Sequence, residues 1–308
     1  MMNTITRGIR YADLNFQGRE HVIATAVIES PSGVTLVDPG PTSCLETLRA
    51  ALSDHGIAVG DITAILLTHI HLDHAGASGT LVTENPGIAV YVHERGARHM
   101  VDPTRLLASA TRLYGEDMDR LWGEFLPVPE GNIRRLAGGE RIRAADRDLE
   151  VAYIPGHASH HVGYFDRSSG IAFVGDTAGI RIGSELFALP PTPPPDIDVE
   201  VWRESISAIR DWRASTLFIT HFGPHEGVDA HLDVLLEHLD AVALMAQRSL
   251  ELEAESDEVR MSAFVDDLRL YLQRHVPSST VALYDYAAPL SQCWLGLARY
   301  FRKRAERV

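Results

Sequence analysis

The stretch Thr68-His69-Ile70-His71-Leu72-Asp73-His74-Ala75-Gly76 brings three imidazoles and a carboxylate together within six residues. It directly follows Ala64-Ile-Leu-Leu-Thr68, a short apolar run that predicts a buried strand. A loop at the carboxyl end of a strand can direct several side chains at one point. The H-x-H-x-D-H pattern therefore predicts a metal-binding loop.

Three further residues with the same ligand chemistry also follow apolar, strand-like runs: His157, Asp176 and His221. Each alone would more often be a satisfied polar residue at the end of an element. Four strand ends that share one chemistry favour convergence on a common site.

The combined set holds five imidazoles and two carboxylates, which is too many for one tetrahedral zinc ion. It suits two metals that share a carboxylate and a bridging hydroxide, separated by about 3.5–4 Å. The alternate residues His69 and His71 can bind one ion while Asp73 and His74 reach its neighbour.

This order of motifs resembles the metallo-β-lactamase superfamily. The likeness covers roughly residues 10 to 226 and rests on Asp38 in Val37-Asp-Pro-Gly40, His69/His71/Asp73/His74, His157 in Pro155-Gly-His157, Asp176 in Val174-Gly-Asp-Thr177, and His221 in Thr220-His-Phe-Gly223. It implies an α/β fold, the αββα sandwich, with the metals at one edge and a helical extension at the carboxyl end.

The resemblance also implies a role for each residue. The first metal would be held by His69, His71 and His157, the second by Asp73, His74 and His221, and both by Asp176. Asp38 and His161 match positions that orient the ligands; His160 is the adjacent alternative to His161. We expect His93, His99, His225 and His231 to be surface or packing residues. The cofactors would be two divalent ions, with zinc favoured and iron or manganese also suited to these ligands.

Asp176 stands where antibiotic-cleaving members carry cysteine, so the chain resembles the glyoxalase-II-like and lactonase-like branch. Glutathione-binding motifs are not recognisable in residues 177–183, and Gly179 replaces the tyrosine of well-known lactonases. We therefore expect a hydrolase that cleaves an ester, lactone or thioester with a metal-bridging hydroxide, in which Asp73 and Asp176 are catalytic. Arg181 and Pro193 would border the substrate pocket. The alternative is a mononuclear iron oxidoreductase that resembles persulfide dioxygenases.

The chain divides, by pattern, into a catalytic domain at 1–226, with a helical insertion at about 94–126, and a helical region at 227–308. Three helices are expected in the latter, at about 229–256, 257–275 and 282–304, and the proline-rich segment 189–195 must be extended. An apolar stripe on the first of these helices predicts packing on the sandwich or on a second copy, so a homodimer is possible.

The amino-acid composition excludes some classes of binding partner. The 308 residues carry 28 Lys and Arg against 42 Asp and Glu, a net charge of −14 that repels nucleic acids and anionic membranes. The two cysteines, Cys44 and Cys293, predict neither a disulfide framework nor a thiolate metal site. Residues 1–10 show no signal-peptide pattern, and no run of 18 apolar residues occurs. We expect a cytoplasmic protein that acts on a small molecule.

Overall fold

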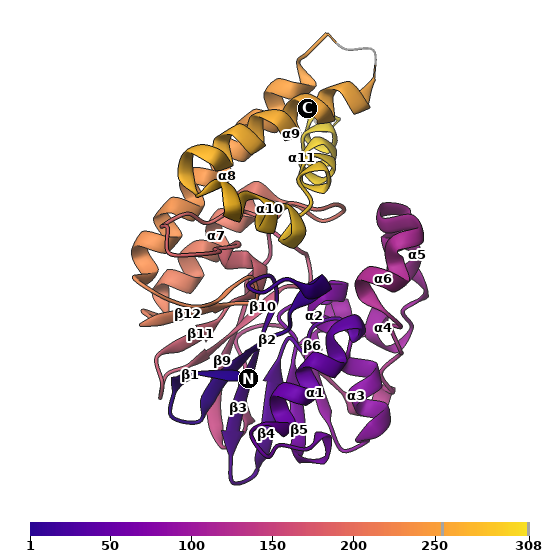
Figure 1. The fold of residues 1–308 in the computed structure, drawn as a ribbon, viewed down its shortest axis with the longest axis vertical. Coiled ribbons are helices and arrows are strands. Elements are labelled where there is room, and N and C mark those ends of the chain that lie inside the picture. Colours follow the sequence, from indigo (N-terminus) through magenta and orange to yellow (C-terminus); the bar gives the residue numbers. More distant parts are fainter. Residues whose placement is uncertain (254–255, 307–308) are drawn as a thin grey trace.

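The computed structural model describes residues 1–253 and 256–306, and two β-sheets form its centre (Figure 1). The first sheet has seven strands in chain order: β1 (Met2–Thr6), β2 (Ile9–Asp13), β3 (Ala24–Ser30), β4 (Gly33–Val37), β5 (Ile62–Leu66), β6 (Ala89–His93) and β7 (Ile133–Leu136). Strands β1 to β4 pair antiparallel, and β4 to β7 pair parallel.

The second sheet has six strands: β8 (Arg141–Ala144), β9 (Arg147–Tyr153), β10 (Val162–Asp166), β11 (Ile171–Phe173), β12 (Thr216–Ile219) and β13 (Gly223–Glu226). Only β11 and β12 pair in parallel. Sequence patterns predicted most of the central strands, whereas β1, β2, β7, β8 and β13 were not expected as strands.

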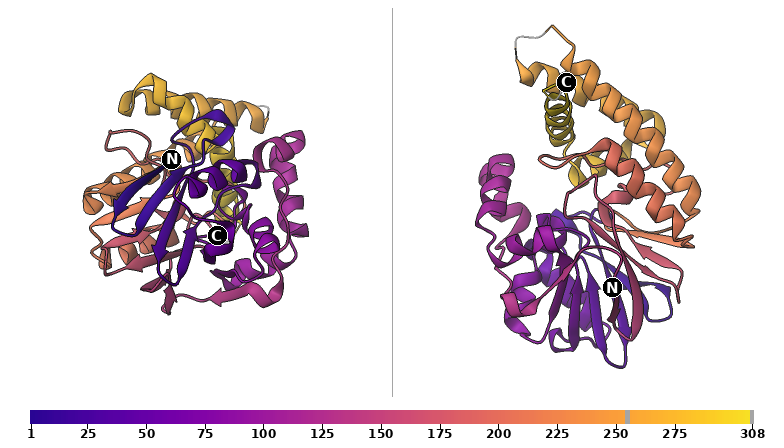
Figure 2. Two further views of the ribbon diagram at one scale, coloured as in Figure 1. Left: turned by 60° about the horizontal axis from the view of Figure 1, so that its bottom comes forward. Right: turned by 180° about the vertical axis from the view of Figure 1, so that it is seen from behind.

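Successive side chains along a strand point to opposite faces of the sheet, so one face packs on the other sheet and the other face on helices. In β5, Ala64 and Leu66 face a core shared with the second sheet, while Ile65 faces the helices outside. The apolar run at residues 64–66 of β5 is explained by burial on both faces, whereas Thr63 near the start of the strand is exposed. The outer layers are α1 (Leu45–Ser53) and α3 (Ser78–Glu84) on the first sheet and α7 (Val199–Asp211) on the second. The α/β sandwich expected from the sequence is thus confirmed (Figure 2).

The insertion after β6 is three helices, where one long helical stretch at 94–125 was expected. They are α4 (Glu94–Val101), α5 (Thr104–Tyr114) and α6 (Met118–Trp122). Pro103 lacks an amide donor, and Gly115 adopts a positive φ of 52°, so the helix is interrupted at both places.

The carboxyl-terminal region contains four helices in the described residues: α8 (Val228–Leu250), α9 (Asp257–His275), α10 (Ser278–Ala287) and α11 (Leu290–Ala305). The predicted helix at 282–304 was wrong, because Pro289 separates α10 from α11. The first tail helix was predicted to reach residue 256, but α8 ends at Leu250; residues 254–255 of that prediction lie outside the described residues.

The tail helices share a hydrophobic core with the second sheet. Leu232, Leu235 and Leu239 of α8 are fully buried in the cluster that contains Trp202 of α7 and Leu217 of β12. The expected packing of this apolar stripe on the sandwich is therefore what the structure shows, and the homodimer stays a prediction. Across the described part of the chain, no helix combines the length and hydrophobicity that spanning a bilayer requires.

Candidate metal centre

The loop after β5 delivers four of the predicted ligands. His69 and His71 lie in extended chain, two residues apart, and His71 is the N-cap of the short helix α2 (Leu72–Ala75). Asp73 and His74 then project from its first turn. The backbone changes from extended to helical after His71, so His69 and His71 point to one group of ligands and Asp73 and His74 to another.

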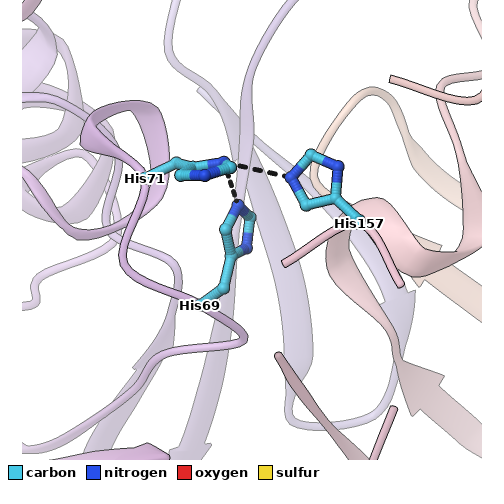
Figure 3. A group of neighbouring side chains, drawn as sticks. All are labelled: His69, His71 and His157. Atoms are coloured by element: carbon cyan, nitrogen blue, oxygen red, sulfur yellow. Dashed lines mark hydrogen bonds between the residues drawn. The ribbon is translucent and has the colours of Figure 1, made fainter. Parts of the chain in front are cut away.

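The first group is His69, His71 and His157, which meet through ring nitrogens (Figure 3). Nδ1 of His71 lies 2.9 Å from Nε2 of His69 and 3.0 Å from Nε2 of His157. His157 arrives from the loop after β9 in the second sheet, so this group joins the two sheets at their edge.

The second group is Asp73, His74 and His221, and His221 follows β12. Oδ2 of Asp73 lies 3.3 Å from Nε2 of His221 and 3.8 Å from Nε2 of His74. These separations are too long for good hydrogen bonds, yet short enough for all three atoms to contact one ion.

Asp176 lies between the groups, in the turn after β11. Its Oδ2 is 3.4 Å from Nε2 of His157, whereas its Oδ1 is 3.3 Å from Nε2 of His74 and 3.6 Å from Nε2 of His221. One carboxylate therefore presents an oxygen to each group.

The polar atoms at the centre fit divalent metals. Nε2 of His74, Nε2 of His221 and Oδ1 of Asp176 are fully buried, and each is without a hydrogen-bond partner. Buried polar atoms are rarely left unpaired, because their desolvation is then uncompensated. Three such atoms directed at one point, on imidazole and carboxylate groups, match the donor set that divalent metals take.

The outer nitrogens of these rings are held by acceptors. Nδ1 of His157 contacts the Pro191 carbonyl oxygen at 2.8 Å, and Nδ1 of His221 contacts that of Val22 at 2.7 Å. A carbonyl oxygen only accepts, so each Nδ1 carries the proton. Each Nε2 then keeps a free lone pair directed into the site.

The Asp38 carboxylate accepts hydrogen bonds from the ligand His74 and from residues next to other ligands, which is the kind of contact its predicted orienting role requires. Its Oδ2 accepts from Nδ1 of His74 at 2.8 Å, from the Thr68 hydroxyl at 2.7 Å and from the Thr220 hydroxyl at 2.9 Å. Its Oδ1 accepts from the Thr68 amide at 2.8 Å. One buried carboxylate thus connects the ligand loop, His74 and the end of β12.

Burial and charge shift the pKa values of the ligands in different directions. Burial would lower the pKa of His74 and of His221, but Asp176 and Asp73 outweigh it and raise both. Burial, followed by the neighbouring His157, lowers the pKa of His71 to about 3, so this ring is neutral at pH 7. Burial alone would raise the pKa of Asp73, but His74 and His221 outweigh it and lower that pKa to about 2. Neutral imidazole and ionised carboxylate are the forms that coordinate metals.

His161 contacts the site by stacking. Its ring lies 4.8 Å from that of His69, with 17° between the planes, and both of its ring nitrogens are buried without a partner. The alternative, His160, packs against His71 with ring centroids 5.8 Å apart and lines the adjoining cavity. Both histidines therefore lie beside the first group.

A cavity of about 830 Å³ opens beside the centre, lined by His71, Asp73, His157 and Asp176. Its other walls come from α4, α5, the proline-rich segment and the junction of α10 with α11. Pro193 lines it, as expected. A smaller cavity of about 370 Å³ reaches Asp73 and His221 from the other side.

Arg181 does not line either cavity. Its amide donates to the His221 carbonyl oxygen at 2.8 Å, and its Nε donates to the Glu185 carbonyl oxygen at 3.0 Å. The chain turns at Gly179, and Ile180 then pairs with Leu189, which carries the guanidinium away from the pocket.

Sequence reasoning missed several residues that line the larger cavity. His99 was taken as a surface or packing residue, but it lies in the cavity wall together with Tyr114 and Arg105. These residues belong to no motif. The only available signal was their spacing on one face of the insertion helices.

The comparisons with known proteins identify the family. Residues 18–221, more than half of the chain, match the model of the metallo-beta-lactamase superfamily, and the chain belongs to that superfamily. A metallo-beta-lactamase fold-containing protein of Sulfurisphaera tokodaii is 28% identical over 168 residues, which are 52% of this chain and 60% of the relative. A hydroxyacylglutathione hydrolase of Gloeothece citriformis is 27% identical over 146 residues, 46% of this chain and 42% of the relative. The chain thus spans about half the length of these curated relatives.

A solved structure supports the fold over nearly the whole chain. The metallo-beta-lactamase family protein from Thermus thermophilus matches with a TM-score of 0.71 at 22% identity, and the match covers 98% of this chain and 95% of that protein. Together with the His/Asp groups, family membership indicates a divalent-metal site.

Proposed function

We propose that this protein is a dinuclear metal-dependent hydrolase that cleaves an ester, lactone or thioester. The observation that carries the proposal is the position of Asp176, whose two oxygens lie 3.3–3.6 Å from ring nitrogens of both ligand groups. A single-metal site would need only one of these groups. The native metal is proposed to be zinc, and the substrate a small molecule that enters the larger cavity.

Two bound divalent ions would supply a hydroxide near neutral pH and polarise the substrate carbonyl. The chain's own residues do the rest. His69, His71 and His157 would hold one ion, Asp73, His74 and His221 the other, and Asp176 both. The cavity walls orient the carbonyl and exclude bulk water.

Asp73 is ionised, because its pKa is lowered to about 2, and is proposed to take up the proton that the attacking hydroxide gives up and to pass it to the leaving group. It lines both cavities, and its side chain is the most exposed of the carboxylates at the centre, at 17% against 5% for Asp176 and 0% for Asp38. It is therefore the carboxylate that a departing alkoxide or thiolate can reach.

The test is metal content per chain by elemental analysis, on protein purified without added metal, with turnover of matched ester, lactone and thioester substrates. We expect two ions per chain in the natural protein. The His71→Ala variant should lose metal and activity. His55→Ala is the matched control, because in the described residues the His55 ring bonds only to the Ala51 carbonyl oxygen, and this variant should keep both metal and activity.

One iron per chain with oxygen consumption on a persulfide would overturn the hydrolase in favour of the oxidoreductase alternative. Absence of metal would overturn both. Two ions without turnover of any of the three substrate types would contradict the proposed reaction class.

A further inference from the structure

The outer part of the larger cavity carries the opposite charge to the molecule as a whole. Apart from the candidate ligands, its charged lining residues are four arginines and two carboxylates: Arg95, Arg98, Arg105, Arg135, Glu94 and Asp196. The whole chain has 28 basic against 42 acidic residues. Local positive charge in so acidic a protein concentrates anions at this one place.

Three of these arginines have uncompensated charge. Arg135 is paired with Glu130 at 2.7 Å. In the described part of the chain, Arg95, Arg98 and Arg105 are in no ion pair. Arg95 instead donates to the Tyr153 hydroxyl at 3.0 Å, and Arg98 to Nε2 of its neighbour His99 at 3.1 Å.

The two acidic residues of the wall, Glu94 and Asp196, offset only part of this charge, and in the described residues neither is in an ion pair with these arginines. The Asp196 carboxylate accepts a hydrogen bond from the Ser159 hydroxyl. The pKa of His99 is lowered, first by burial and then by Arg98 and Arg105. The positive charge of the two arginines therefore extends along the cavity wall and is available to a ligand.

Helix α5 sets the distance between this charge and the metal centre. Its residues 105, 106, 109, 110, 113 and 114 line the cavity, which is the spacing of a single helix face. Arg105 and Tyr114 lie at the two ends of this face, nine residues apart, or about 13.5 Å at about 1.5 Å per residue. Tyr114 marks the metal end, because it also lines the smaller cavity beside Asp73 and His221.

The wall between the two ends is mostly apolar. Leu106, Ala110 and Leu113 occupy the middle of the α5 face, and Pro193 of the proline-rich segment also lines the cavity. A ligand that lies along the α5 face would extend from the metal end, over these apolar side chains, to Arg105.

We propose that Arg95, Arg98 and Arg105 bind an anionic group, a carboxylate or a phosphate, at the far end of an otherwise apolar substrate. The planar guanidinium fork matches both groups. This inference rests on the proposed hydrolase function and narrows its substrates to anionic esters, lactones or thioesters with a long apolar spacer. Neutral substrates of the same length are poorer ligands.

The test measures binding by titration calorimetry on the metal-loaded protein, with octanoate, octyl phosphate and octanol as probes. The Arg98→Gln/Arg105→Gln double variant is compared with Arg112→Gln, which alters an exposed α5 arginine outside the cavity lining. At least one anion should bind the natural protein ten times or more tightly than octanol. The affinity of the double variant for that anion should fall at least tenfold, and its affinity for octanol should not change. The Arg112→Gln control should bind all probes as the natural protein does.

Comparing octanoate with octyl phosphate shows whether the arginines prefer a carboxylate or a phosphate. The anion that binds more tightly identifies the terminal group of the substrate. Octanol binding as tightly as both anions would overturn the inference. So would unchanged anion affinity in the double variant, as expected if the carboxylate or phosphate bound the metals instead. Binding is read without turnover, so arginine-dependent binding in a protein that cleaves no ester, lactone or thioester would overturn only the reaction class.

Discussion

Replacing Asp38 with Asn tests whether one buried carboxylate organises the metal centre. Asn tolerates the left-handed backbone of this position, where φ is 50°, and its oxygen can still accept from the Thr68 amide. The three hydrogen bonds to Oδ2, from His74, Thr68 and Thr220, are lost because the amide nitrogen does not accept. At about 1.5 kcal/mol for each bond to a charged group, the free energy of unfolding should fall by about 4.5 kcal/mol.

Urea unfolding of the metal-free protein measures this loss separately from metal binding. Chelator competition on the folded protein should show metal affinity reduced about 10–100-fold, because His74 loses the acceptor that fixes its Nδ1 proton. The matched variant Thr220→Val removes one of the three donors and should cost about 1.5 kcal/mol. If Asp38→Asn is no less stable than Thr220→Val and binds metal normally, the reasoning about Oδ2 is refuted.

Three further results are expected. Removing metal with a chelator should lower the unfolding temperature, since a ligand present at about 1,000 times its Kd stabilises by about 4.1 kcal/mol; an unchanged temperature would contradict a site in the folded protein. Burial would raise the pKa of Asp166, but bonds from Ser168 and Ser169 and the Arg147 ion pair outweigh it and lower that pKa. The stability that ionised Asp166 contributes is thus present above pH ~4 and lost as the pH falls further. The difference in free energy of unfolding between the natural protein and Asp166→Asn, measured in urea, should therefore narrow below pH ~4. Gly296→Ala places a Cβ 2.0 Å from the Thr192 carbonyl oxygen, whereas a Cβ on Gly60 meets nothing within 4 Å; the first should cost about 2 kcal/mol in urea unfolding and Gly60→Ala almost nothing.

Local patterns predicted the core strands well. The apolar, strand-like run expected before His221 is β12. Burial on both faces makes such strands readable from composition alone. The errors in the predicted helices fell where helical periodicity continues across a break in the helix. Pro103 and Pro289 each separate two helices. The apolar residues keep their helical spacing on both sides of each proline, so the pattern predicted one continuous helix.

Sequence alone determined the family, the sandwich and which seven residues meet at the centre. It could do so because each ligand follows a strand, and the sheet fixes the position of a strand's end through backbone hydrogen bonds. Only the tertiary structure decided what the cavity presents to a substrate. Arg181 is not part of the cavity wall, whereas Arg105 and Tyr114 are, because the wall comes from segments as far apart in the chain as Ile70 and Cys293. Tyr114, for example, bonds to Gln292, 178 residues away. Their meeting depends on packing between distant surfaces, which leaves no periodic or motif-like trace in the local sequence.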